Sequence, residues 1–145
     1  MAEEHGSILA LEGYVNHVLA TPDQLASLLE RFPTPRLQVV LDPFNYLSKD
    51  LVPDCERVAA AFCSRFADRF VVAHLKDVSP EGAEVDTPEF GQGVFPHALY
   101  IGFLRTRRPD LPIILEHLPF GHIPDAIRRI HEIAGTDAGP NPTLS

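Results

Sequence analysis

The sequence predicts an α/β protein built from parallel strand–helix units, and three observations carry that prediction. Four short apolar segments, at residues 7–12, 37–42, 70–77 and 111–116, alternate with segments of helical periodicity. Short apolar runs without helical spacing are typical of strands buried on both faces, as in parallel sheets. Each run also ends in ionisable residues, and α/β proteins build their sites at that carboxyl edge of the sheet.

The first strand and the first helix follow from local signals. Residues 7–12 form an apolar run that ends in Glu12. The sequence Thr-Pro-Asp-Gln at 21–24 supplies an N-cap, a proline at the first helical position and a glutamine three residues after the cap. We therefore expect a helix from there to about residue 31, with its leucines on the buried face. The second strand, 37–42, ends in Asp42.

The second half of the chain repeats this alternation. A helix is expected over 54–68, with Val58, Ala61, Phe62 and Phe66 on its buried face, and it leads into the strand at 70–77. A long polar linker follows, and it contains the sequence Phe-Gly-Gln-Gly at 90–93. The remaining expected elements are a helix over 95–107, a strand over 111–116 and a helix over 123–134.

Composition narrows the class of protein. The 145 residues are enough for one domain with a real core, which we place at residues 1–135, and the aperiodic segment 136–145 is expected to be a disordered tail. A net charge of −8 argues against nucleic acid or an anionic membrane as partner, and no apolar run reaches the length of a membrane span. Cys55 and Cys63 are too far apart on a helix to pair, so we expect a cytoplasmic protein.

The residues that end the four strands form one chemical set. Glu12, Asp42, His74 and Glu116 follow one another at steps of 30, 32 and 42 residues, which suit βα units. Parallel strands bring such ends to one edge of the sheet, where the side chains can converge. Three carboxylates and an imidazole suit Mn²⁺, Mg²⁺, Co²⁺ or Zn²⁺, so the set predicts a site for one divalent metal ion.

These residues and their neighbours resemble a known family. The segments Leu-Ala-Leu-Glu (9–12), Leu-Asp-Pro-Phe-Asn (41–45), His-Leu-Lys-Asp (74–77), Gly-Gln-Gly (91–93) and Ile-Leu-Glu-His (114–117) look like the sugar isomerase/epimerase group of the xylose isomerase-like TIM-barrel superfamily. The resemblance covers roughly residues 3–135. Members that epimerise free ketoses often carry histidine three residues after the aspartate that corresponds to Asp42, where this chain has Asn45.

The resemblance implies a site and a reaction. The metal would be held by Glu12, Asp42, His74 and Glu116, at the mouths of barrel strands five to eight. Glu12 and Glu116 would move a proton beside a sugar carbonyl through an enediolate, as base and acid.

Three further residues are expected to contact a sugar or sugar phosphate substrate. Asn45 and Lys76 could bind substrate oxygens, and His117 could support the metal ligand beside it. Loop turns and a solvated lysine remain the alternatives for Asn45 and Lys76. Gly91 and Gly93 are expected to shape the loop after the third strand, with phosphate binding as an alternative. The remaining histidines at 17, 97, 122 and 131 are interpreted as surface or loop residues.

The length of the chain bears on the barrel. A whole barrel needs eight βα units, and this chain supplies four, so we expect the C-terminal half of a TIM barrel. Such a half could be a truncated gene product or a natural half-barrel. In either case we expect the chain to have little activity alone. Open sheet edges predict a homo-oligomer or another pairing that covers them. Three alternatives stay open: a non-catalytic fragment or subunit, a dehydratase acting on a polyol ketone, and a nuclease of the same superfamily, which the charge opposes.

Overall fold

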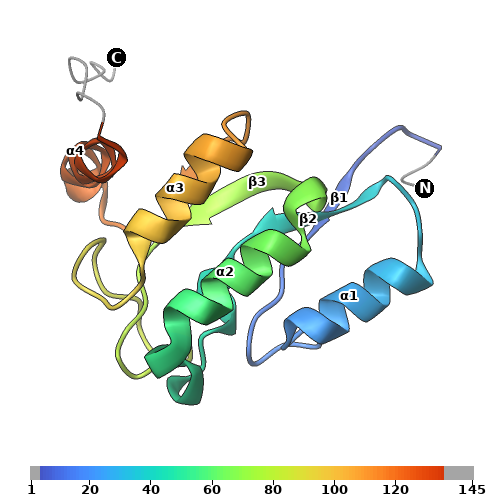
Figure 1. Cartoon of the computed structure of the whole chain (residues 1–145), viewed down its shortest axis with the longest axis horizontal. Helices are drawn as coiled ribbons and strands as arrows, with labels where there is room; N and C mark the ends of the chain where they lie inside the picture. The colour runs from blue at the N-terminus through green and yellow to red at the C-terminus, as the bar shows by residue number, and fades with distance from the viewer. Residues whose placement is uncertain (1–3, 136–145) are drawn as a thin grey trace.

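The computed structural model describes residues 4–135 and contains one parallel sheet with strand order β1-β2-β3-β4. The strands are β1 (Leu9–Leu11), β2 (Leu37–Leu41), β3 (Phe70–Leu75) and β4 (Ile113–Leu115). The helices that follow them are α1 (Pro22–Arg31), α2 (Cys55–Arg65), α3 (His97–Arg107) and α4 (Ile123–Ala134). The predicted α/β fold of parallel units is confirmed, and it is consistent with half of a TIM barrel (Figure 1). The tail predicted at 136–145 lies outside the described residues.

Four short 3₁₀ helices complete the structure. Their bounds are η1 (Pro43–Tyr46), η2 (Lys49–Asp54), η3 (Ala67–Arg69) and η4 (Phe120–His122). The helix predicted over 54–68 is thus α2 followed by η3, and the helix predicted from residue 95 begins at His97. The predicted capping box at the start of α1 is present, with the Thr21 side chain accepting from the Gln24 amide while Gln24 accepts from the Thr21 amide.

Each strand is shorter than the apolar run that predicted it, and the two edge strands are shortest. β1 and β4 have three residues each, whereas β2 has five and β3 six. An edge strand has a hydrogen-bonding neighbour on one side only, so its ladder ends sooner. Glu12, Asp42 and Glu116 therefore each lie one residue beyond the end of a strand, and His74 is the last residue but one of β3.

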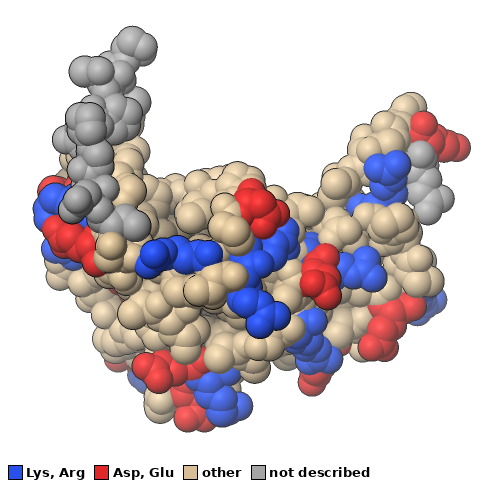
Figure 2. Space-filling view, turned by 45° about the horizontal axis from the view of Figure 1, so that its top comes forward, with Lys and Arg blue, Asp and Glu red and all other residues tan. Residues whose placement is uncertain are grey.

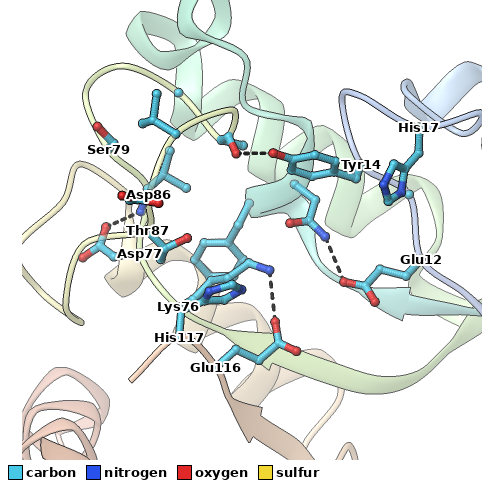
Figure 3. A pocket seen from close by; sticks show the side chains of 17 residues that line it. Glu12, Tyr14, His17, Lys76, Asp77, Ser79, Asp86, Thr87, Glu116 and His117 are labelled. Atoms are coloured by element: carbon cyan, nitrogen blue, oxygen red, sulfur yellow. Dashed lines mark hydrogen bonds and ion pairs between the residues drawn. The ribbon is translucent and has the colours of Figure 1, made fainter. Parts of the chain in front are cut away.

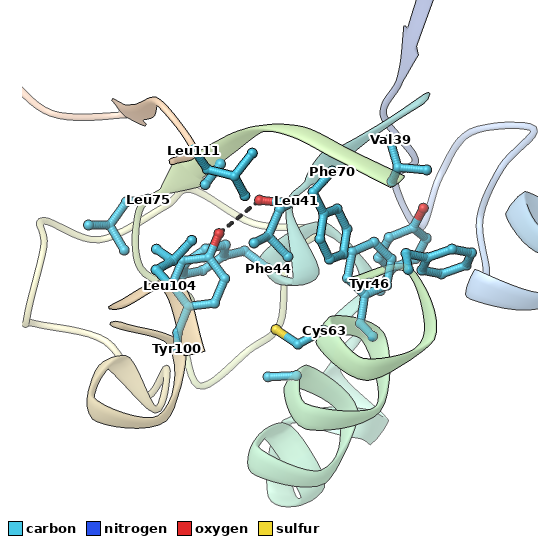
Figure 4. Packing of buried hydrophobic residues seen from close by; sticks show 14 of the residues in the cluster. Val39, Leu41, Phe44, Tyr46, Cys63, Phe70, Leu75, Tyr100, Leu104 and Leu111 are labelled. Carbon is cyan, nitrogen blue, oxygen red and sulfur yellow. Dashed lines mark hydrogen bonds between the residues drawn. The ribbon is translucent and has the colours of Figure 1, made fainter. Parts of the chain in front are cut away.

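The core lies between the sheet and the helices. Val39, Leu41 and Ala73, all fully buried, point from the sheet toward side chains of α1, α2 and α3, which share one side of the sheet (Figure 1). The hydroxyl of the buried Tyr100 of α3 lies 2.8 Å from the carbonyl oxygen of Leu41 (Figure 4) and 2.8 Å from that of His74, and it can donate its proton to either. This contact ties α3 to the carboxyl ends of the two central strands.

The predicted face of α2 was wrong at one position. Phe62 and Phe66 are buried, but Ala61 is exposed, and the buried alanine of this helix is Ala59. Cys63 completes the buried face instead, one helical turn from Ala59. Both cysteines are free, as their spacing predicted.

The two edges of the described sheet expose apolar side chains. At one edge, Ile8 directly before β1 is 55% exposed and Leu9 in β1 is 57% exposed. At the other edge, Ile113 and Ile114 of β4 are 45% and 47% exposed. Large exposed aliphatic groups on open strand edges are a typical site of pairing with another chain. Among the described residues, no helix has the length and apolar character needed to span a membrane.

Candidate metal centre

The parallel register brings the four predicted ligands to one edge of the sheet. Leu41 pairs with Ala73, so Asp42 lies beside His74, and Leu75 pairs with Leu115, so Glu116 lies two positions further along the same edge, beside Lys76. Leu11 of β1 pairs with Val39 of β2, which places Glu12 next to them. In this register the four side chains leave the sheet on the face opposite the helices, since alternate residues point to opposite faces. One donor atom from each lies within 4.8 Å of the others.

His74 is the centre of this arrangement. Its Nδ1 lies 3.2 Å from Asp42 Oδ2, 3.2 Å from Glu116 Oε1 and 3.4 Å from Glu12 Oε1. Asp42 is almost completely buried, while the side chains of Glu116 and Glu12 are 26% and 40% exposed. One imidazole nitrogen therefore faces three carboxylates from three different strand ends.

Hydrogen bonding alone does not account for this geometry. An imidazole nitrogen carries at most one proton and cannot donate to three carboxylates at once. Metal–ligand bonds of about 2.1 Å place neighbouring donor atoms about 3.0 Å apart in octahedral and about 3.4 Å apart in tetrahedral coordination. The spacings of 3.2–3.4 Å around His74 Nδ1 fall in that range, so the four residues fit a small divalent cation.

Lys76 compensates part of the negative charge. Its Nζ donates to Asp42 Oδ2 at 2.9 Å and to Glu116 Oε2 at 3.0 Å, and the side chain is 6% exposed (Figure 3). Three ionised carboxylates and one ammonium leave a formal charge of −2 when His74 is neutral. A divalent cation would balance that charge, which is a second respect in which the donor set fits such an ion.

The same contacts shift the protonation equilibria. Burial and the neighbouring Asp42 carboxylate raise the pKa of Glu12. Burial would also raise the pKa of Asp42, but hydrogen bonds from His74 and Lys76 outweigh it and lower that pKa. The hydrogen bond to Asp42 raises the pKa of His74. Glu12 thus takes up a proton more readily than Asp42 does.

Asn45 lies at the site but is already bonded to the ligand carboxylates. Its Nδ2 donates to Glu12 Oε1 at 2.8 Å and to Asp42 Oδ2 at 3.1 Å. Its backbone amide, in η1, also donates to Asp42 Oδ1 at 3.3 Å. Its donors thus orient two of the candidate metal ligands, and the binding of substrate by Asn45 stays a prediction.

A cavity of about 510 Å³ opens beside the cluster. Its walls include Glu12, Lys76, Glu116 and His117, and the wall facing them is the polar linker from Val78 to Thr87 (Figure 3). Tyr14 holds that linker by donating its hydroxyl to the Ala83 carbonyl oxygen at 2.7 Å. The linker, which had no periodicity to interpret, supplies seven of the 17 lining residues.

His117 has an unusual backbone. Its φ of 53° is the only positive φ of a non-glycine residue in the described chain. Such a conformation is uncommon for a residue with a side chain and often marks a functional site. It turns the chain directly after Glu116, and His117 contributes to the cavity wall, while its contact with substrate stays a prediction.

One histidine differs from its interpretation as a surface or loop residue. His97 is 8% exposed and lies at the start of α3, with Nε2 3.1 Å from Asp77 Oδ2. His17 is an exposed loop residue, as interpreted, but it also lies edge-on against Tyr14 and lines the cavity. Neither histidine follows an apolar strand, so the pattern that marked the other site residues did not mark these two.

The fold and site define a class of α/β protein that gathers side chains able to bind a metal ion at the carboxyl ends of parallel strands. Within that class, the family model for the xylose isomerase-like TIM barrel matches residues 1–133. The chain therefore belongs to the xylose isomerase-like TIM-barrel family, as its motifs predicted. No curated protein matches the chain.

Proposed function

We propose that the chain is a divalent-metal-dependent isomerase or epimerase of a polyhydroxy carbonyl compound, and that it transfers a proton through an enediolate. The observation that carries this proposal is the placement of His74 Nδ1 within 3.4 Å of a carboxylate oxygen of Glu12, Asp42 and Glu116. The family membership supports the same class of function.

Glu12, Asp42, His74 and Glu116 would hold the metal, and the site suits Mn²⁺, Mg²⁺, Co²⁺ or Zn²⁺. When bound, such an ion polarises a carbonyl group and so acidifies the neighbouring C–H. Lys76 and Asn45 keep the carboxylates in place through their hydrogen bonds. Both residues would then act on substrate mainly through the ligands they position.

The proton transfer is assigned to Glu12 and Glu116. They extend from opposite edges of the sheet and both line the cavity, so they can flank a bound substrate (Figure 3). Burial raises the pKa of Glu12, which makes its carboxylate a stronger base toward a proton on carbon. Return to the opposite face of the same carbon gives epimerisation, and delivery to the adjacent carbon gives aldose–ketose isomerisation.

A dehydratase of a polyol ketone would use the same first step. It differs afterwards, because the carbanion formed beside the carbonyl expels a hydroxide instead of being reprotonated. Product analysis separates these two outcomes: isomerisation conserves mass, whereas dehydration lowers it by one water. A non-catalytic fragment or subunit would show neither product and no Mn²⁺ binding.

We also propose that a second copy of this chain covers the sheet edges. The β4 edge of one copy and the β1 edge of the other both carry exposed aliphatic residues, and both strands belong to parallel sheets. A two-fold arrangement pairs β4 with the partner β1 twice, and it closes eight strands into one ring. The apolar side chains of Ile8, Leu9, Ile113 and Ile114 would be buried there.

Hydrogen exchange at carbon tests the function without a known substrate. The Mn²⁺-loaded chain is incubated in D₂O with a panel of ketoses and ketose phosphates, and the proton signal beside each carbonyl is followed by NMR. We expect one substrate to lose that signal, and Glu12→Gln and Glu116→Gln to slow the loss at least about 100-fold. Asp110→Asn, which changes an exposed carboxylate far from the cavity lining, is the matched control. Unchanged exchange in both glutamine variants would refute the assignment.

A further inference from the structure

The carboxylate of Asp77 is buried at the start of α3 and accepts five hydrogen bonds. The side chain is 1% exposed. The donors are the backbone amides of Val78 (2.8 Å), Gly91 (2.8 Å), Gly93 (3.0 Å) and Phe95 (3.2 Å) and the Nε2 of His97 (3.1 Å). No candidate metal ligand is among them. The Asp77 carboxylate therefore supplies the negative charge to which the amides of the loop between β3 and α3 bond.

The donors around Asp77 form the kind of nest that binds phosphate in other proteins. Backbone amides of a glycine-rich loop at the start of a helix provide partial positive charge and several N–H groups that point at one centre. Barrels of this architecture frequently bind substrate phosphate at the loops after their last two strands. Here the nest is already filled: a Cβ added at Gly93 would lie 2.2 Å from Asp77 Oδ1, so the loop closes directly on the carboxylate.

The rest of the cavity wall is also unsuited to an anion. Four carboxylates, Glu12, Asp77, Asp86 and Glu116, line the described cavity, and Lys76 is the one lysine or arginine among the lining residues. The Lys76 ammonium is already bonded to two carboxylates. The linker wall itself, residues 78–87, contains three acidic residues and no basic one.

Neutral hydrogen-bonding groups remain available on that wall. Ser79 and Thr87 line the cavity, and so does the backbone around Ala83 that Tyr14 holds in place. Hydroxyl groups can donate to or accept from the hydroxyls of a polyol without placing a charge in the cavity. The wall therefore offers partners to a neutral polyol and repels a phosphate dianion.

We propose that the substrate is an uncharged polyhydroxy carbonyl compound and that Asp77 fills the nest in which a phosphorylated substrate would otherwise be held. This inference rests on the proposed function for the identity of the reacting group. Its structural part concerns anion binding at Asp77 and can be tested without turnover or metal.

The test is a titration of the metal-free full chain with inorganic phosphate, followed through the backbone amide signals of Gly91 and Gly93. We expect no saturable shift of these two signals in the wild-type chain. In Asp77→Ala, we expect phosphate to shift both signals and to restore part of the thermal stability that the substitution removes. Asp110→Ala is the control and should show neither effect. A saturable shift in the wild-type chain, or a folded Asp77→Ala chain that phosphate leaves unchanged, would overturn the proposal.

A second measurement tests whether the substrate is uncharged, and it uses the wild-type chain, so it does not depend on the folding of Asp77→Ala. The ketose that the D₂O exchange assay identifies is compared with its own phosphate ester, and we expect kcat/KM for the ester to be at least about tenfold lower. A preference for the ester would refute the substrate class while leaving the isomerase function intact. Failure of the proposed function would instead appear as absent Mn²⁺ binding and absent exchange with every compound, whatever the phosphate titration gives.

Discussion

Lys76 and Asp42 form a buried ion pair: Nζ lies 2.9 Å from Oδ2, and the two side chains are 6% and 1% exposed. The pair lies within the candidate metal cluster itself, because the same Asp42 oxygen lies 3.2 Å from His74 Nδ1. An ammonium and a divalent cation would thus share one carboxylate. Mutual repulsion between them sets how tightly the metal binds.

Lys76→Met removes that repulsion and keeps most of the side-chain volume. We expect Mn²⁺ to bind at least about tenfold more tightly by calorimetry, because the carboxylates lose their internal counter-charge. The metal-free variant should unfold at lower temperature, since Asp42 then lacks a buried partner. Lys49→Met is the control: Lys49 pairs with Glu81 on the surface and should change neither quantity. Weaker Mn²⁺ binding in Lys76→Met would contradict this account of the ion pair.

Asn45→Ala tests whether Asn45 acts through the ligands. The substitution removes the Nδ2 donor that holds Glu12 and Asp42, so we expect Mn²⁺ affinity to fall about 10- to 100-fold. Replacement of the exposed Asn16 by alanine serves as the control and should leave the affinity unchanged. If Asn45 only contacts substrate, the metal affinity of Asn45→Ala will equal that of the wild-type chain.

Asp77→Asn is expected to change stability in a pH-dependent way. Burial would raise the pKa of Asp77, but the bonds from His97 and the loop amides outweigh it, and that pKa is lowered in the folded chain. Its stabilising effect is therefore fully present above its unfolded pKa of about 3.9 and is lost as pH falls through the folded pKa. At pH 7 the free energy of unfolding of the variant should be lower than that of the wild-type chain by about 2 kcal/mol. The reason is that the NH₂ group of the new asparagine cannot accept hydrogen bonds from the backbone amides that bond to the Asp77 carboxylate.

Denaturant unfolding from pH 7 down to pH 3 measures this effect. The free energy of unfolding of the wild-type chain should fall more steeply with acid than that of Asp77→Asn. Asp86→Asn, a change at an exposed carboxylate of the cavity wall, should follow the wild-type curve. Parallel curves for the wild type and Asp77→Asn would show that the Asp77 charge does not stabilise the loop.

The double variant Ile8→Lys, Ile114→Lys tests the covering of the sheet edges. Two lysines on opposite edges should prevent pairing, because they add charge to the interface and remove apolar area from it. Light scattering should then give the mass of one chain for the double variant and the mass of two chains for the wild type. Leu51→Lys places the same charge on η2, away from both edges, and should leave the dimer intact. A monomeric wild-type chain with the helical content of the structure would refute the dimer.

Much of the fold and the cluster could be predicted because the signal was local. Asp42 and His74 end apolar strands, and alternation of strands with capped helices places such ends on one edge of a parallel sheet. The linker from 78 to 94 could not be predicted in this way. Its course depends on Asp77, whose partners are as far as His97, and a polar sequence without periodicity does not reveal such bonds.

The role of Asn45 shows a second limit. Its position after β2 indicated the site, but whether its amide faces a substrate or a neighbouring carboxylate depends on Glu12, 33 residues earlier. On the face that Figure 2 shows, basic and acidic residues are interspersed.

Replacement of His74 by alanine is the measurement that tests the central claim most directly. His74 supplies the one nitrogen of the proposed ligand set, and its Nδ1 contacts all three carboxylates. We predict that calorimetry will show Mn²⁺ binding at least about 100-fold weaker in His74→Ala, with unchanged helical content, while the surface variant His122→Ala binds as the wild type does. Undiminished Mn²⁺ binding by a folded His74→Ala chain would contradict the account.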